Sequence, residues 1–118
     1  MRLVLVSASL LLALAAGAPA ATHGARLAVR PALVSPGAAI RVVGNASPCH
    51  AGNTVQAISK AFPGHAYGGE GALHGRVRAG GAFTISGRVR ATLAAGRYAV
   101  TARCGGGNLG VTAYVRVR

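Results

Sequence analysis

The stretch Gly96-Arg97-Tyr98-Ala99-Val100-Thr101-Ala102-Arg103-Cys104 decides the fold class of this sequence. Alternate positions divide it into an inward and an outward set, Tyr98, Val100, Ala102 and Cys104 against Arg97, Thr101 and Arg103. Successive side chains of a β-strand point to opposite faces, so a period of two residues indicates a strand with one buried face and one solvated face. The stretch therefore predicts a half-buried strand and not a helix.

The same alternation recurs along the rest of the chain. The inward positions are Ile40 and Val42; Leu73, Gly75 and Val77; Phe83, Ile85 and Val89; and Val111, Ala113, Val115 and Val117. Residues 26–30 and 54–60 show a weaker form of the pattern. Several short strands separated by Gly, Pro, Asn and Ser are typical of a β-sandwich. We therefore expect an all-β fold of about seven antiparallel strands.

Two turns are expected from the positions of glycine. At residues 79–81, a three-residue loop would pair Val77 with Phe83 and Arg76 with Thr84, which keeps each pair on one face of a hairpin. Such loops usually place one residue in the left-handed region, which glycine permits. The stretch from Gly105 to Asn108 predicts a second hairpin, between the last two strands.

The first twenty residues have the three-part pattern of a secretory signal. Arg2 supplies the basic end, residues 3–16 are an uncharged apolar stretch, and Ala18-Pro19-Ala20 is a small-residue cleavage signature. The apolar stretch is shorter than the ~20 residues that a membrane span needs. We expect a signal peptide over residues 1–20 and a secreted domain over residues 21–118.

The two cysteines agree with export. Cys49 and Cys104 are 55 positions apart, and an even count in an exported chain favours a disulfide, here expected to bridge two sheets. A metal site that also used His50 is the alternative. Thiolate sites usually need two close pairs of ligands, and His50 would point away from its neighbour Cys49 on a strand. The four histidines, His23, His50, His65 and His74, show no metal-ligand spacing, so no metal or cofactor is expected.

Charge is the most unusual feature of the composition. The 118 residues include thirteen Lys and Arg and a single acidic residue, Glu70, for a formal net charge of +12. Removing residues 1–20 takes away Arg2, so the remaining 98 residues carry +11. A single carboxylate excludes the paired-carboxylate chemistry of glycosidases and acidic Mg²⁺ or Ca²⁺ sites. A Ser-His-Asp triad lacks its Asp, and we expect no enzyme.

Two segments resemble a known group of proteins. The first is Ala28-Val29-Arg30-Pro31, Val34-Ser35-Pro36-Gly37 and Ile40-Arg41-Val42-Val43-Gly44 before Cys49; the second runs from Ala95 to Cys104, with Phe62 between them. These stretches resemble the small secreted immunoglobulin-like β-sandwich proteins of high-GC bacteria. The resemblance implies a disulfide from near the end of the second sandwich strand to the sixth, and it implies no activity. Trp is absent, and Tyr98 precedes Cys104 by six residues instead of two, so it is not the usual tyrosine corner.

A more distant similarity is to the apo-proteins of enediyne antibiotics, which are secreted sandwiches that hold a small apolar ligand. Those proteins typically carry two disulfides and an acidic surface, and this sequence has neither. A carrier of a small molecule is therefore the alternative function.

The preferred interpretation is a non-catalytic secreted domain that associates with anionic envelope polymers, or a lipid surface, through its basic surface. The candidate anion-binding residues are Arg76, Arg78, Arg88, Arg90, Arg116 and Arg118. A solvated basic surface without a specific ligand is the simpler interpretation of the same residues. Specific nucleic-acid binding is not expected, because such proteins gather charge on one stripe with stacking aromatics, and only Tyr67 and Tyr114 are plausible exposed aromatics.

One loop is a second candidate site. Residues 63–71 form the longest unpatterned stretch and contain His65, Tyr67 and the only carboxylate, Glu70. Loops on a rigid scaffold often carry function, although a simple surface connection is the alternative interpretation.

Overall fold

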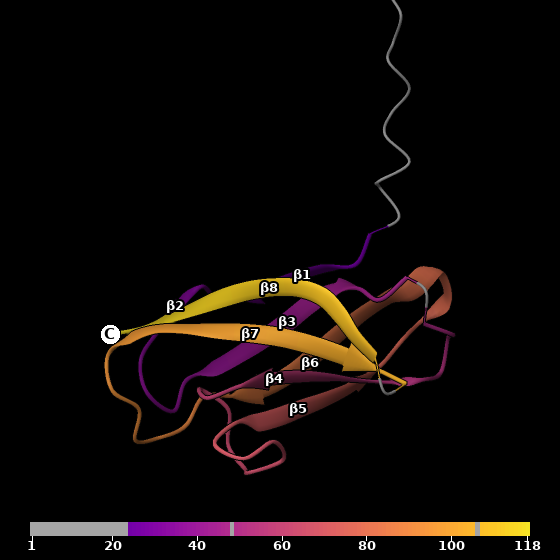
Figure 1. Ribbon diagram of the computed structural model, residues 1–118. Coiled ribbons are helices and arrows are strands. Elements are labelled where there is room, and N and C mark those ends of the chain that lie inside the picture. The colour runs from indigo at the N-terminus through magenta and orange to yellow at the C-terminus, as the bar shows by residue number, and fades with distance from the viewer. Residues whose placement is uncertain (1–23, 48, 106) are drawn as a thin grey trace, which may run out of the picture.

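The computed structural model describes residues 24–47, 49–105 and 107–118, and the predicted signal peptide of residues 1–20 lies outside them. The described residues form eight strands and no α-helix (Figure 1). In chain order the elements are β1 (Arg26–Arg30), β2 (Leu33–Val34), β3 (Ala39–Asn45), β4 (Thr54–Ser59), β5 (Gly71–Arg76), a single 3₁₀ turn (Ala79–Gly81), β6 (Ala82–Arg88), β7 (Gly96–Cys104) and β8 (Gly107–Val117). The prediction of an all-β fold is confirmed.

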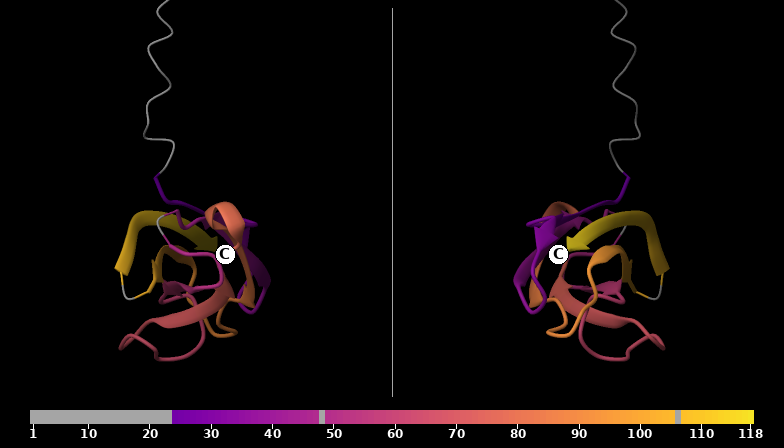
Figure 2. Two further views of the ribbon diagram at one scale, coloured as in Figure 1. Left: turned by 90° about the vertical axis from the view of Figure 1, so that its right-hand side faces the viewer. Right: turned by 90° about the vertical axis from the view of Figure 1, so that its left-hand side faces the viewer.

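The strands form two sheets. One has three strands in the order β1-β3-β6, and the other has five in the order β2-β8-β7-β4-β5. Every pairing is antiparallel except that of β2 with β8, which is parallel. Seen from either end, the sheets form two layers, and β8 bends strongly along its length (Figure 2). One core lies between the layers, because side chains from both sheets contribute to it.

The core confirms the alternation read from the sequence. Val42 and Val55, from different sheets, are fully buried, and so are Val100 and Val115. Their chain neighbours on the other face are exposed or half-buried, as the burial pattern of β8 shows with each second residue toward solvent. Burial of a valine or larger aliphatic side chain contributes about 1.5–3 kcal/mol, so this inward face supplies most of the folding free energy.

Strand β2 is the one strand that the sequence pattern did not predict, because its two residues are too few to show alternation. Its pairing with β8 places Leu33 beside Arg116. Pro31 separates it from β1 and has no N–H to donate to a ladder, so the chain leaves the three-stranded sheet there and joins the five-stranded one.

The expected hairpin between β5 and β6 is wrong. β5 pairs only with β4, and β6 pairs with β3 in the other sheet, so the 3₁₀ turn at residues 79–81 carries the chain from one sheet to the other. Gly80 and Gly81 do adopt positive φ angles of 82° and 90°. Both arrangements bury Val77 and Phe83, so alternation alone could not distinguish a hairpin from a change of sheet.

The two strands instead meet face to face. A Cβ on Gly75 of β5 would collide with the side chain of Ile85, and a Cβ on Gly87 of β6 would collide with Leu73. These two glycines allow the sheets to approach closely at this edge. The other expected hairpin is confirmed, since β7 and β8 pair antiparallel with Cys104 opposite Gly107; Gly106 lies outside the described residues.

Cys49 and Cys104 are joined in a disulfide with 6.4 Å between their Cα atoms. Cys49 lies in the connection from β3 to β4, which passes from one sheet to the other, and Cys104 ends β7. The bond therefore ties this crossover to the five-stranded sheet. Disulfides persist in oxidising environments, so the bonded pair points to a location outside the cytoplasm.

Tyr98 precedes Cys104 by six residues, so the sequence did not predict a tyrosine corner, yet its hydroxyl makes the hydrogen bond of one. Its hydroxyl donates a hydrogen bond of 2.6 Å to the carbonyl oxygen of Ala94, at the corner between β6 and β7. A tyrosine near the start of this strand whose hydroxyl bonds to backbone a few residues upstream makes the interaction of a tyrosine corner. The spacing to Cys104 is unusual, but the hydrogen bond is present.

Candidate anion-binding surface

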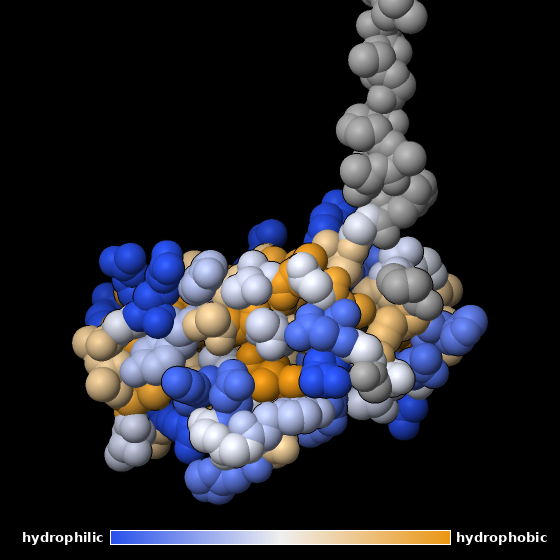
Figure 3. Space-filling model, in the orientation of Figure 1, coloured by the Kyte–Doolittle hydropathy of each residue, from blue (hydrophilic) through white to orange (hydrophobic). Residues whose placement is uncertain are grey.

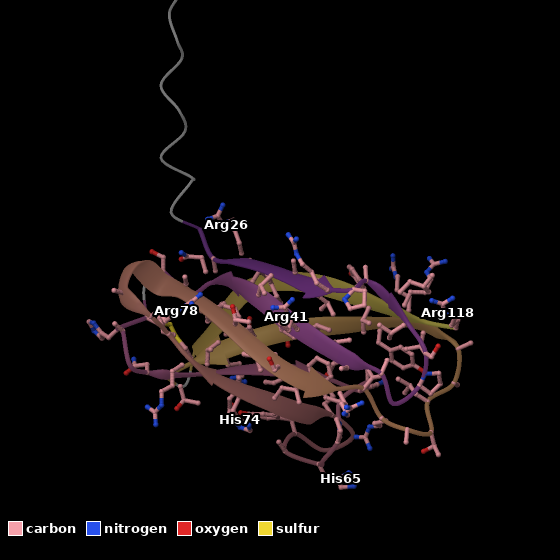
Figure 4. The ribbon with its side chains drawn as sticks, turned by 180° about the vertical axis from the view of Figure 1, so that it is seen from behind. Arg26, Arg41, His65, His74, Arg78 and Arg118 are labelled. Atoms are coloured by element: carbon pink, nitrogen blue, oxygen red, sulfur yellow. A yellow bond between two sulfur atoms is a disulfide. The ribbon has the colours of Figure 1, made fainter. Side chains whose placement is uncertain are left out.

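The six predicted anion-binding arginines do not form one site. Arg76 ends β5, Arg88 ends β6 and Arg116 lies in β8, while the other three follow strand ends. Arg78 and Arg118 lie at opposite ends of the molecule (Figure 4). Because β5 and β6 belong to different sheets, Arg76 and Arg88 stand on different outer faces, not on one hairpin face as expected.

Backbone carbonyl groups engage several of these guanidinium groups. Arg76 donates from Nη1 to the carbonyl oxygen of Gly52 at 3.0 Å, and Arg88 donates from Nη1 to that of Gly37 at 3.2 Å. Both side chains are exposed, so their remaining N–H donors still face solvent. Their charge contributes to the surface potential, while part of each side chain is fixed.

Arg90 is half-buried and serves the fold. Its Nε donates to the carbonyl oxygen of Lys60 at 3.0 Å, and its Nη2 donates to that of Gly64 at 2.8 Å. Its backbone N–H also donates to Ala61 at 2.8 Å. The outward position expected for Arg90 extended the strand alternation past Arg88, where β6 ends. Arg90 thus holds the connection between β4 and β5 against the end of β6.

The candidate loop does not bring its three residues together. Tyr67 and Glu70 exchange two backbone hydrogen bonds, of 3.1 and 3.2 Å, which make a tight turn. Their side chains line different hollows: Tyr67 borders one with Thr54 and Gln56, whereas Glu70 borders another, of about 320 Å³, with Lys60 and Arg97. His65 is exposed and no hydrogen bond joins it to either residue.

Tyr67 belongs to a polar cluster on the outer face of the five-stranded sheet. Its hydroxyl donates to Oε1 of Gln56, whose Nε2 lies 3.1 Å from Nε2 of His74. The guanidinium carbon of Arg103 lies 5.7 Å from the centre of the Tyr67 ring. Register explains the grouping, because Gln56 pairs with His74 on one side and with Arg103 on the other.

This cluster borders an open hollow of about 260 Å³ that also meets Thr54 and Cys104. An aromatic face, an amide and a guanidinium together can contact a polar ligand of modest size. Sequence reasoning placed Arg103 and His74 outward but could not assemble the cluster. Its members come from three strands and a loop, and their register is not visible in the sequence.

A second ring contact lies further along the same face. The guanidinium of Arg97 lies over the ring of Tyr114, 4.2 Å from its centre, and Arg97 is directly opposite Arg116 in the ladder. Tyr114 is 46% exposed, as is Leu33 beside Arg116. On the face shown in Figure 3, hydrophilic residues spread over the surface with apolar ones between them. Tyr67 and Tyr114 are thus the exposed aromatics that the sequence predicted.

In the part of the chain that the structure describes, no three metal-ligating residues lie close enough together to hold an ion. Over the same ranges, no buried side-chain nitrogen or oxygen lacks a hydrogen-bond partner. None of the helical segments described has the length and apolarity to traverse a lipid bilayer.

Comparison with known proteins relates the structure to solved folds. No family model matches the sequence, and no curated protein matches it. The structure is similar to part of the alkylpurine DNA glycosylase AlkC from Pseudomonas fluorescens bound to DNA containing an abasic-site analogue, at 19% identity and a TM-score of 0.55. It is also similar to part of the Yersinia pseudotuberculosis adhesin InvE, at 19% identity and a TM-score of 0.57.

The match covers 80% of this chain and 30% of the glycosylase, and 79% of this chain and 26% of the adhesin. The chain therefore spans less than a third of either protein. At this identity the likeness concerns the fold alone.

Proposed function

We propose that this chain is a secreted, non-catalytic, immunoglobulin-like domain that associates with anionic polymers of the cell envelope through its basic surface. The observation that carries the proposal is the placement of arginines on the outer faces of both sheets in a sequence with one acidic residue. Such a surface attracts polyanions over distances of about a Debye length.

Three features support the immunoglobulin-like assignment. The sheet β1-β3-β6 has the order of strands A, B and E, and β8-β7-β4 has the order of strands G, F and C. The disulfide joins the connection after the B-like strand to the F-like strand, and Tyr98 makes the hydrogen bond of a tyrosine corner. Eight strands with a short parallel β2 replace the expected seven antiparallel ones.

Secretion is supported by two independent features. The disulfide suits an oxidising compartment, and residues 1–20 have the pattern of a cleaved signal. High-GC bacteria are the proposed source because of the sequence resemblance described above. In this setting, phosphate-bearing wall polymers or anionic lipid headgroups would be the polyanions within reach.

The carrier alternative receives less support. A carrier would need a large apolar cavity with a polar rim, whereas the space between the sheets is occupied by a contiguous cluster of buried side chains. Four hollows among the described residues open at the surface, and each includes Arg or Lys in its wall.

The glycosylase neighbour raises DNA as a partner, but the arginines lie on several faces without the single stripe typical of nucleic-acid readers. The non-catalytic assignment is supported by the candidate loop, whose side chains Glu70 and Tyr67 line different hollows instead of meeting at one site.

A binding experiment tests the proposal. Disulfide-bonded residues 21–118 are incubated with cell-wall fractions before and after chemical removal of their anionic polymers, across a series of salt concentrations. We expect retention at low salt, release as salt approaches ~1 M, where the Debye length is ~3 Å, and loss of retention on stripped walls. Equal retention on intact and stripped walls would reject the proposal. A parallel column with double-stranded DNA compares the two polyanions.

A further inference from the structure

Arg30 of β1 and Arg41 of β3 lie directly opposite each other on the outer face of the three-stranded sheet. Both are exposed, and Figure 4 looks onto this face with Arg41 near its middle. Side chains in such a pair have Cβ atoms ~4.5–5.5 Å apart, and like charges directly opposite each other destabilise a ladder. Neither guanidinium makes a hydrogen bond, ion pair or ring contact with another described residue.

This pair differs from those surface arginines whose guanidinium groups are engaged. Arg76, Arg88 and Arg90 donate to backbone carbonyl groups. Among the described strands, Arg97 is also directly opposite an arginine, Arg116, but the guanidinium of Arg97 stacks on Tyr114. Both members of the pair Arg30 and Arg41 therefore have all five of their guanidinium N–H donors available.

The row continues with a hydroxyl group. Ser86 of β6 is opposite Arg41 on the other side of β3, and it is exposed. The three residues Arg30, Arg41 and Ser86 border a hollow of about 370 Å³, whose wall also includes Ala39 and Gly87. Ala39 lies on the same outer face two residues before Arg41, and its small side chain leaves space beside the longer guanidinium groups. Three donors from three adjacent strands thus converge on one depression.

We propose that Arg30, Arg41 and Ser86 form a seat for a phosphate oxyanion. A single guanidinium can satisfy a carboxylate through a bidentate pair of hydrogen bonds. A phosphate group offers more oxygens in a tetrahedral arrangement, so it can bridge two guanidinium groups and accept a third bond from a hydroxyl. Binding also offsets the repulsion within the pair. The seat rests on the proposed function only for the identity of the molecule that carries the phosphate.

The first test is a titration of disulfide-bonded residues 21–118 with inorganic phosphate at constant ionic strength, followed by NMR of the backbone amides. Saturable shifts concentrated at Arg30, Arg41 and Ser86 are expected, with acetate at equal ionic strength giving weaker ones. Shifts that do not saturate, or that spread evenly over all arginines, would overturn the proposal.

Two double variants supply the second test. R30Q/R41Q should weaken phosphate binding by roughly tenfold or more, whereas R78Q/R118Q, which removes the same charge from two exposed arginines at opposite ends, should change it by less than roughly threefold. R41K keeps the positive charge but lacks the planar guanidinium, so its loss of phosphate affinity should lie between those of the two double variants. Equal losses in both doubles would reject a localised seat.

Thermal unfolding without phosphate checks that the effect arises from the pair and not from loss of fold. R30Q/R41Q should melt at the same temperature as the unmodified chain or higher, because like-charge repulsion is removed. Phosphate should raise the melting temperature of the unmodified chain and of R78Q/R118Q, but not of R30Q/R41Q. A phosphate-dependent rise that R30Q/R41Q retains would overturn the assignment.

Competition distinguishes the sources of the phosphate. A soluble polyol-phosphate polymer and vesicles with anionic phospholipid are each tested for displacement of inorganic phosphate at the three amides. Phosphate binding by the seat without retention on cell walls would reject the proposed function and keep the seat. Retention on walls together with undiminished phosphate binding by R30Q/R41Q would reject the seat and keep the proposed function.

Discussion

The hydroxyl of Tyr98 donates to the carbonyl oxygen of Ala94 across the corner that connects the two sheets. β6 belongs to the three-stranded sheet and β7 to the five-stranded one, so the bond fixes the path of a crossover. Tyr98 is half-buried, and its ring packs against the core. A hydrogen bond between residues only four apart in the sequence therefore stabilises the placement of the two sheets relative to each other.

Replacing Tyr98 by Phe should lower the free energy of unfolding by about 0.5–1.5 kcal/mol, because it removes this hydrogen bond and keeps the ring. Chemical denaturation monitored by circular dichroism measures the change. Tyr114→Phe is the matched control, since Tyr114 is exposed, and its effect should stay within about 0.5 kcal/mol. Equal effects of the two substitutions would contradict a role for the corner.

Arg90→Ala should lower the free energy of unfolding by about 1–3 kcal/mol, because two side-chain bonds to Lys60 and Gly64 are lost. Arg90→Lys should restore little, since an ammonium group cannot reproduce the planar fork. Arg78→Ala removes the same charge from an exposed position and should be nearly neutral. Denaturant titration gives the free energies, and limited proteolysis should cut the segment 60–64 faster in Arg90→Ala alone.

Intact-mass analysis of the secreted chain should find two hydrogens fewer than in the reduced chain, because Cys49 and Cys104 are bonded. Replacing both with Ala should cost about 2–5 kcal/mol of stability, since the bond closes a long loop in the unfolded chain. Quantitative alkylation of both thiols in the denatured, unreduced protein would disprove the bond in the secreted form.

Association with envelope polymers should depend on distributed charge. Neutralising Arg76 and Arg78 to Gln should weaken binding to wall fractions about as much as neutralising Arg116 and Arg118, since both pairs are exposed and lie at the ends of different strands, β5 and β8. Affinity should fall steeply with salt, because exposed charges are screened beyond ~8 Å at physiological ionic strength.

A variant with His65, Tyr67 and Glu70 changed to Ala is the control for that measurement. It removes one acidic group and no arginine, so wall binding should not decrease. Salt-insensitive binding, or a loss caused by this loop variant alone, would point to the candidate loop in place of distributed charge.

The sequence by itself determined which residues face the core. The alternation of Val100 and Ala102 with Thr101 and Arg103, and of Phe83 and Ile85 with Thr84 and Ser86, predicted the buried faces that the structure confirms. The pairing of the two cysteines was predicted from their even count in a chain expected to be exported. These features are local or compositional, and alternation depends only on the geometry of a single strand.

Apart from the β7–β8 hairpin, only the tertiary structure decided which strands are neighbours. The sequence could not separate a β5–β6 hairpin from a change of sheet, because both bury Val77 and Phe83. The register that sets Arg30 opposite Arg41, and the contact of Tyr67 with Gln56 and Arg103, depend on residues far apart in the chain. Such contacts form when whole faces pack together, and packing is a property of the assembled sheets and not of any one strand.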